Sequence, residues 1–169
     1  MSDKIFMFLD TVSGSSTDTS HTSWIPVDSV FFETTRKVEF KAASEKKAPE
    51  TTSPVISKII ITKPHCTAST QLYTNLNTLQ KSKLIIDIVQ EKPGAGNIVE
   101  NVVGTGGSTR LESDVCYVSG FKLSGVGTSS EEIELTVSSL AITYNPPKDS
   151  HELDKKTTSG YHFQRSKTL

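Results

Sequence analysis

Apolar and polar residues alternate along several short stretches of this 169-residue chain, which is the pattern of strands with one buried face. The alternation is clearest toward the C-terminal end, where Ile133, Leu135 and Val137 each follow a polar residue. Further stretches are rich in β-branched and aromatic residues and are bounded by Gly, Pro, Ser or Asp. The predicted strands cover residues 5–9, 24–32, 56–62, 84–91, 115–123 and 132–144, with a short strand at 98–103.

Two of these strands contain uninterrupted apolar runs, at 59–61 and 84–86, which are typical of strands covered on both faces. Together with the alternating strands they predict a mainly β fold, a barrel or sandwich of two packed antiparallel sheets. The length suits one domain over residues 1–169, large enough to bury its own core.

One segment has helical spacing and predicts a short amphipathic helix over about 67–81. Leu72, Leu76 and Leu79 recur every three or four residues and are expected to pack on the β core. The residues expected to stabilise the two ends are Thr67 or Ser69 at the start and Lys81 and Lys83 at the end.

A long segment at about 33–54 is predicted to be an extended loop, although it begins with strand-like alternation between Phe32 and Phe40. Its length is unusual inside a compact domain, so it is either mobile or ordered by something outside the subunit. A Gly-rich connection follows at 92–108. The tail at 145–169 is polar until Tyr161 and Phe163, and these aromatic residues predict that it docks on the barrel or on a neighbouring subunit.

Composition narrows the partners. The 18 basic and 19 acidic residues give a formal net charge of -1, which does not favour nucleic acid or a membrane surface. The apolar run at 5–9 is too short for a signal peptide or a membrane span, so we expect synthesis in the cytoplasm and no cleaved signal. Cys66 and Cys116 lie too far apart for a CxxC metal site and are expected to be free thiols.

Candidate chemistry is sparse. The four histidines form no HxxxH or HExxH motif, and the glycines at 94–96 lack the following helix of a dinucleotide site. The SxxK match at 44–47 lies in a charged run with no predicted pocket, and Glu131, Glu132 and Glu134 are expected to point outward from a strand. We therefore expect no catalytic residue, no metal and no cofactor.

Four segments, in order, carry a resemblance to a known family. They are Gly14 to Val30 with its Asp18 and His21, Ile59 to Pro64 followed by the helix, Val115 to Tyr144, and Gly160 to Lys167. The chain resembles the haemolysin-coregulated protein (Hcp) family of bacterial type VI secretion. It differs from the family pattern at Ser15, where Glu is usual, at Tyr161, where Trp is usual, and in the Asp and Pro that usually precede the helix.

The resemblance implies a structural subunit that forms hexameric rings, which stack into an inner tube and are expelled from the bacterium. It also implies partners, namely a spike protein, sheath and baseplate components, and effector cargo. The extended loop and the tail then become the expected contacts between copies, with ion pairs between loop charges. The predicted interface residues are Glu33, Arg36, Lys37, Glu39, Lys41, Glu45, Lys46, Lys47, Glu50, Tyr161 and Phe163.

Two other functions fit the same sequence. A tail tube protein of a phage-like contractile particle would share the fold logic, and spike and sheath genes nearby would separate the two. A monomeric β-sandwich binding module would need an exposed aromatic platform, for which Trp24 is the sole tryptophan.

Overall fold

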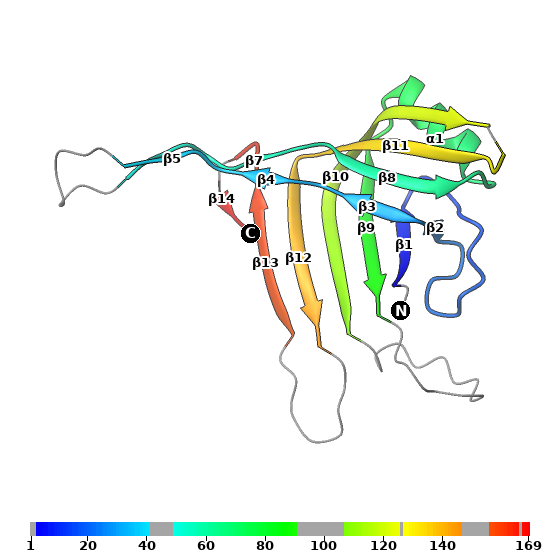
Figure 1. Ribbon diagram of the computed structural model, residues 1–169, viewed down its shortest axis with the longest axis horizontal. Helices are drawn as coiled ribbons and strands as arrows, with labels where there is room; N and C mark the ends of the chain where they lie inside the picture. The colour runs from blue at the N-terminus through cyan, green and yellow to red at the C-terminus, as the bar shows by residue number, and fades with distance from the viewer. Residues whose placement is uncertain (1–2, 41–48, 91–106, 126, 147–155, 166) are drawn as a thin grey trace, which may run out of the picture.

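The computed structural model describes residues 3–40, 49–90, 107–125, 127–146, 156–165 and 167–169 (Figure 1). In that part of the chain it contains a ten-stranded sheet, two small two-stranded sheets and one helix. The elements are β1 (Lys4–Leu9), β2 (Ile25–Val27), β3 (Ser29–Phe31), β4 (Thr34–Thr35), β5 (Val38–Glu39), β6 (Glu50–Thr51), β7 (Val55–Ile56), β8 (Ile59–Pro64), α1 (Ser69–Thr78), β9 (Ser82–Val89), β10 (Ser108–Ser124), β11 (Ser130–Val137), β12 (Ser139–Asn145), β13 (Thr157–His162) and β14 (Lys167–Thr168).

The long strand β10 joins the two layers of the fold. Its first part pairs with β9 and β12, and its second part, from Cys116 onward, pairs with β11. The pairing continues antiparallel through β12–β13–β14, through β9–β1–β2 and through β11–β8–β3. Because β2, β3 and β14 end these paths without pairing to one another, the fold is the sandwich of the two predicted alternatives rather than a closed barrel.

The core lies between the layers and is built from alternate residues of paired strands. Met7, Ile86 and Leu111 stand side by side in register on β1, β9 and β10, and each is at most 2% exposed. The apolar runs were expected to be covered on both faces, but Ile60 and Ile85 are only half-buried. Each of these strands therefore buries one face fully, as the pleat requires, and leaves the other partly accessible.

The predicted strand at 24–32 is divided in two. Residues before Asp28 pair with β1, residues after it pair with β8, and the Asp28 amide donates to the Thr62 carbonyl at 2.8 Å. The chain thus crosses from one layer to the other at this point. The predicted strand at 98–103 lies outside the described residues.

The helix is shorter than predicted, and its ends differ from the sequence expectation. It begins at Ser69 without a side-chain cap, and it stops where Leu79 takes a left-handed conformation with φ 51°. Leu72 is fully buried, but Leu79 is 69% exposed, so its assignment to the core was wrong. The two lysines expected in the last turn lie beyond the helix because the chain has already turned toward β9.

Candidate subunit interface

The segment predicted as an extended loop forms a β-ribbon that projects from the sandwich (Figure 1). β4 pairs with β7, and β5 pairs with β6, so the chain runs out and back as two antiparallel strands. At its base, the Ser57 amide donates to the Glu33 carbonyl at 2.8 Å, and the Glu33 amide donates to the Ser57 hydroxyl at 2.9 Å. The base is thus fixed while the outer part leaves the body.

The charged residues of the ribbon are engaged with the ribbon itself. Arg36 donates from Nε to the Thr52 carbonyl at 2.7 Å and from Nη2 to the Thr51 hydroxyl at 3.2 Å. Lys37 forms an ion pair with Glu39, and Glu39 lies opposite Glu50 in the register. Of the predicted interface residues, Lys41, Glu45, Lys46 and Lys47 lie outside the described residues.

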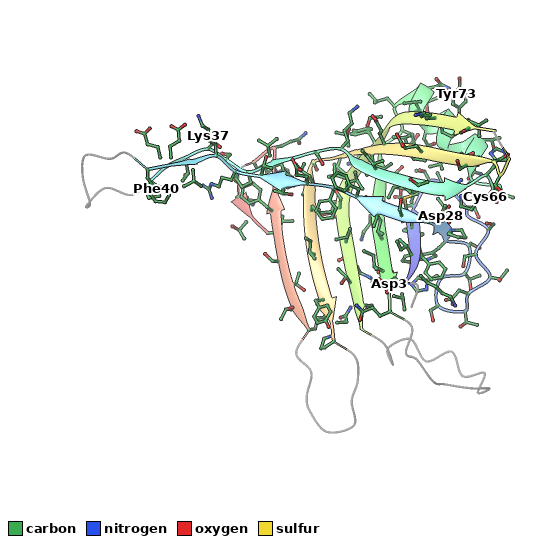
Figure 2. The ribbon with its side chains drawn as sticks, in the orientation of Figure 1. Asp3, Asp28, Lys37, Phe40, Cys66 and Tyr73 are labelled. Atoms are coloured by element: carbon green, nitrogen blue, oxygen red, sulfur yellow. The ribbon has the colours of Figure 1, made fainter. Side chains whose placement is uncertain are left out.

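Exposed apolar residues on the ribbon were not among the predicted interface residues. Phe40 is 83% exposed, Val55 63%, Phe31 58% and Val38 47%. Figure 2 places Phe40 and Lys37 on the part of the ribbon far from the body. The signal that could have found them is the strand-like alternation up to Phe40 in a segment with no core to face.

Tyr161 and Phe163 are built into the body rather than into the ribbon. Their rings contact each other at 5.4 Å between centroids, and Phe163 packs against the hydrophobic core. The Phe163 amide also donates to the Ser138 carbonyl at 2.9 Å. These contacts hold β13 and the turn after it against β12, so both residues already have partners within the chain.

Loop 13–24 lies over the outer face of β1, β9 and β10, where a buried polar cluster holds it. His21 stacks on Phe6, and its Nε2 and Nδ1 lie 2.9 Å from Asp87 Oδ2 and 3.1 Å from Asp18 Oδ1. Arg110 donates two hydrogen bonds to Asp87, at 2.7 and 2.6 Å. Both ring nitrogens are thus occupied by carboxylates, and the cluster offers no nucleophile for His21 to activate.

The same loop explains one feature of the family resemblance. A Cβ on Gly14 would lie 2.1 Å from the Trp24 carbonyl oxygen, so only glycine fits where the two ends of the loop meet. The Gly14 amide donates to the Ser23 carbonyl at 2.8 Å and closes the loop. The Gly-to-His motif therefore builds a structural loop.

A second buried cluster ties the start of α1 to β8 and β11. Lys63 and Glu131 have fully buried side chains, and Nζ lies 2.6 Å from Oε2. Lys63 also donates to the Pro64 carbonyl at 2.9 Å and to the Ser69 hydroxyl at 3.2 Å. The other Glu131 oxygen lies 2.5 Å from His65 Nδ1.

The expectation that Glu131 points outward was therefore wrong, and the cause is the register of β11. Glu131 alternates with Glu132 and lies beside Ile133 on the inward face, opposite Lys63 of β8. Burial raises the pKa of the Glu131 carboxyl, but its hydrogen bonds from Lys63, Ser69 and His65 outweigh burial and lower the pKa.

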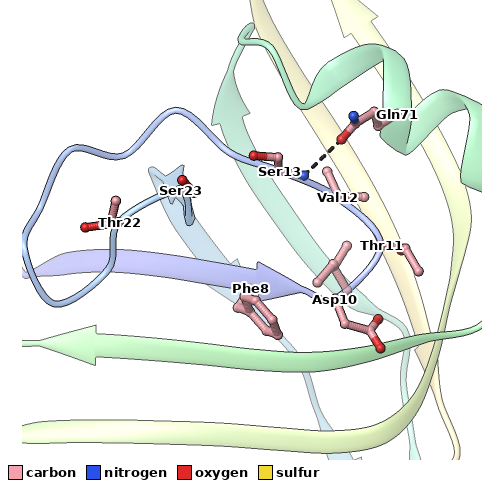
Figure 3. A pocket seen from close by; sticks show the side chains of 9 residues that line it. Phe8, Asp10, Thr11, Val12, Ser13, Thr22, Ser23 and Gln71 are labelled. Atoms are coloured by element: carbon pink, nitrogen blue, oxygen red, sulfur yellow. Dashed lines mark hydrogen bonds between the residues drawn. The ribbon is translucent and has the colours of Figure 1, made fainter.

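Sites for small ligands are poorly developed in the described residues. The depression in Figure 3 is shallow, and its polar atoms bond to the chain itself: the Ser13 amide donates to Gln71 Oε1 at 2.9 Å. No group of three or more potential metal ligands occurs among the residues that the structure describes. Cys66 and Cys116 are unpaired, and burial raises the pKa of the Cys116 thiol to about 12.

The sandwich and its projecting ribbon define a class of β proteins that act through contact surfaces and assemble. The family model described as "Type VI secretion system effector, Hcp" matches residues 6–145, which is most of the chain. The chain therefore belongs to the Hcp family, the tube proteins of type VI secretion. No curated protein sequence matches it.

Solved structures agree with this fold. Hcp1 from Salmonella typhimurium is 18% identical, with full coverage of both chains and a TM-score of 0.74. A "type six secretion system protein" is 19% identical, covers 99% of this chain and 100% of its own, and has a TM-score of 0.78. A chain of the anti-feeding prophage baseplate is 5% identical, with coverage of 83% and 91% and a TM-score of 0.53. No helix among the described residues is long and apolar enough to cross a membrane.

Proposed function

We propose that six copies of this tube protein close into a ring and that the rings stack into the inner tube. The ribbon is the observation that supports this proposal. An isolated two-stranded hairpin is at best marginally stable in water, and this one carries its most exposed aromatic residue, Phe40, away from its own body. A neighbouring copy would supply the surface that the ribbon lacks.

A closed ring also explains why the ribbon is asymmetric with respect to the body. Cyclic assembly beyond a dimer requires that one patch of each subunit contacts a different patch of the next. A projecting element that cannot reach its own subunit is suited to be one of these two patches. The predicted interface residues on the ribbon remain candidates for this contact.

The partners and location follow from family membership and are part of the proposal. The tube would be made in the bacterial cytoplasm, would carry a spike and effector cargo, and would leave the cell when the sheath contracts. The role is structural, so no cofactor is needed. The similarity to a baseplate chain of the anti-feeding prophage favours one second candidate, a tube component of a phage-like contractile particle.

Sedimentation velocity and negative-stain microscopy of the purified full chain test the proposal. We expect a ring of about six copies, the closed cyclic assembly of this family. Monomers alone at high protein concentration would contradict it and would favour the monomeric binding module. Co-purification with spike and sheath proteins would separate the secretion tube from the phage-like particle.

A further inference from the structure

One part of the core face is left uncovered by the second layer. Leu140 is buried on β12, but the next two residues on the same face, Ile142 and Tyr144, are 39% and 42% exposed. Residues paired in register share a face, so this surface continues onto the neighbouring strands. The open face, as we call it, consists of Ile88, Thr109, Ile142, Tyr144, Thr157 and Ser159.

The open face contains no charged residue. It is an extension of the hydrophobic core, because Ile142 lies opposite the buried Leu111, and Ile88 packs against the core. A charged group placed against such a surface would lose its hydration without gaining a partner. The surface that covers the open face should therefore be uncharged as well.

The ribbon has one face of this kind. Val38 and Phe40 alternate with Lys37 and Glu39, so the apolar pair and the charged pair project to opposite sides. Val38 lies opposite Thr51 in the register, whereas Glu39 lies opposite Glu50. The ribbon can thus bury its uncharged face and keep its charged face in water.

A different exposed apolar patch is less suited to receive this face. Leu79 and Leu123, near the end of α1 and on β10, are 69% and 57% exposed. Lysines at 81, 83 and 122 accompany them in the sequence, and Lys83 and Lys122 are exposed. Seating Phe40 there would place an apolar ring among hydrated cations.

We propose that the face of the ribbon formed by Val38 and Phe40 packs on the open face of a second copy. The inference rests on the proposed ring or tube, and it identifies the two different patches that a cyclic contact requires. Phe40 is the anchor, since a large apolar side chain that becomes buried contributes most of the energy of such a contact.

Disulfide trapping tests this pairing in the full chain. In a Cys66→Ser background, which leaves only the buried Cys116, we combine Phe40→Cys with Ile142→Cys. Mild oxidation should convert most of the protein into a ladder of covalent oligomers. The matched control combines Phe40→Cys with Leu79→Cys, which is also exposed, and should stay monomeric in denaturing gels.

The outcomes separate this inference from the proposed function. Rings without a Phe40–Ile142 ladder, or a ladder in the Leu79 control, would overturn the contact and leave the tube intact. A parent protein that forms no rings would overturn the proposed function and this contact with it. Single-cysteine variants confirm that each chain folds, by circular dichroism, before oxidation.

Discussion

At the scale of single residues, the buried pair of Lys63 and Glu131 governs how the helix is attached to the sandwich. Each partner is fully buried, so neither charge has water to solvate it if the other is removed. Ser69 accepts hydrogen bonds from Lys63 and from the Cys66 amide, which fixes the turn before α1 without a conventional cap. The Lys-Pro segment of the family resemblance is thus a structural element in this chain.

Lys63→Met should lower the free energy of unfolding by about 3–5 kcal/mol, because it leaves Glu131 buried and unpaired. Chemical denaturation measures the change. The double variant Lys63→Met with Glu131→Leu should recover much of it, since no unpaired charge remains. Lys58→Met is the matched control: Lys58 is 55% exposed and pairs with Glu134 at 2.6 Å, so its loss should cost no more than about 1 kcal/mol.

The lowered pKa of Glu131 predicts an acid-dependent stability. Because the folded carboxyl has a lower pKa than the unfolded one, the unfolded chain binds more protons in acid. The contribution of Glu131 is therefore present above the ordinary glutamate pKa of about 4.3 and is lost as the pH falls below it. Unfolding midpoints in urea should decline less steeply toward low pH in Glu131→Gln than in the parent; equal slopes would contradict this.

At the scale of elements, the ribbon and the sandwich differ in what holds them together. The sandwich strands share a continuous buried core, whereas the outer ribbon has exposed side chains on both faces. The ribbon residues Val38 and Glu39 pair only with Thr51 and Glu50 in the described register. The ribbon should therefore be dispensable for folding.

Deleting residues 39–52 should leave the fold intact and abolish ring formation or stacking. The segment contributes no residue to the described hydrophobic core, so the unfolding midpoint should change little. Circular dichroism and denaturation report the fold, and sedimentation velocity reports assembly. Loss of soluble monomer would show instead that the ribbon is needed to fold, and the charge-only variant Glu39→Gln serves as the control that should still assemble.

At the scale of the whole molecule, two patches on opposite parts of one subunit would make a ring possible. The ribbon projects from one side of the sandwich, and the open face lies at the uncovered end of the other layer (Figure 1). The charges of the ribbon are bonded within it, at Arg36 and between Lys37 and Glu39. The contact between copies should therefore depend on apolar burial more than on ion pairs.

Assembly should accordingly persist at high salt. Raising NaCl to about 1 M shortens the Debye length to about 3 Å and would weaken an interface made of exposed ion pairs. Sedimentation velocity at low and high salt should give the same proportion of rings. Dissociation at high salt would instead support the ion pairs between loop charges that the sequence predicted.

The sequence determined the strand-rich fold, the position of the helix and the family, because period-two alternation and the order of the four segments are local properties of the chain. It also located the projecting segment by its unusual length. The tertiary structure decided which side chains meet. Register placed Glu131 inward beside Lys63, and the left-handed turn at Leu79 ended the helix early.

The structure also changed which part of the ribbon matters. From sequence, its charges looked like contacts for another copy; in three dimensions Arg36 and Lys37 are bonded within the ribbon, and Val38 and Phe40 are left exposed. The uncovered Ile142 and Tyr144 could not be identified by pattern, because their alternation is that of an ordinary buried strand. Whether such a face is covered depends on how far the second layer extends, which only the packing of the two layers decides.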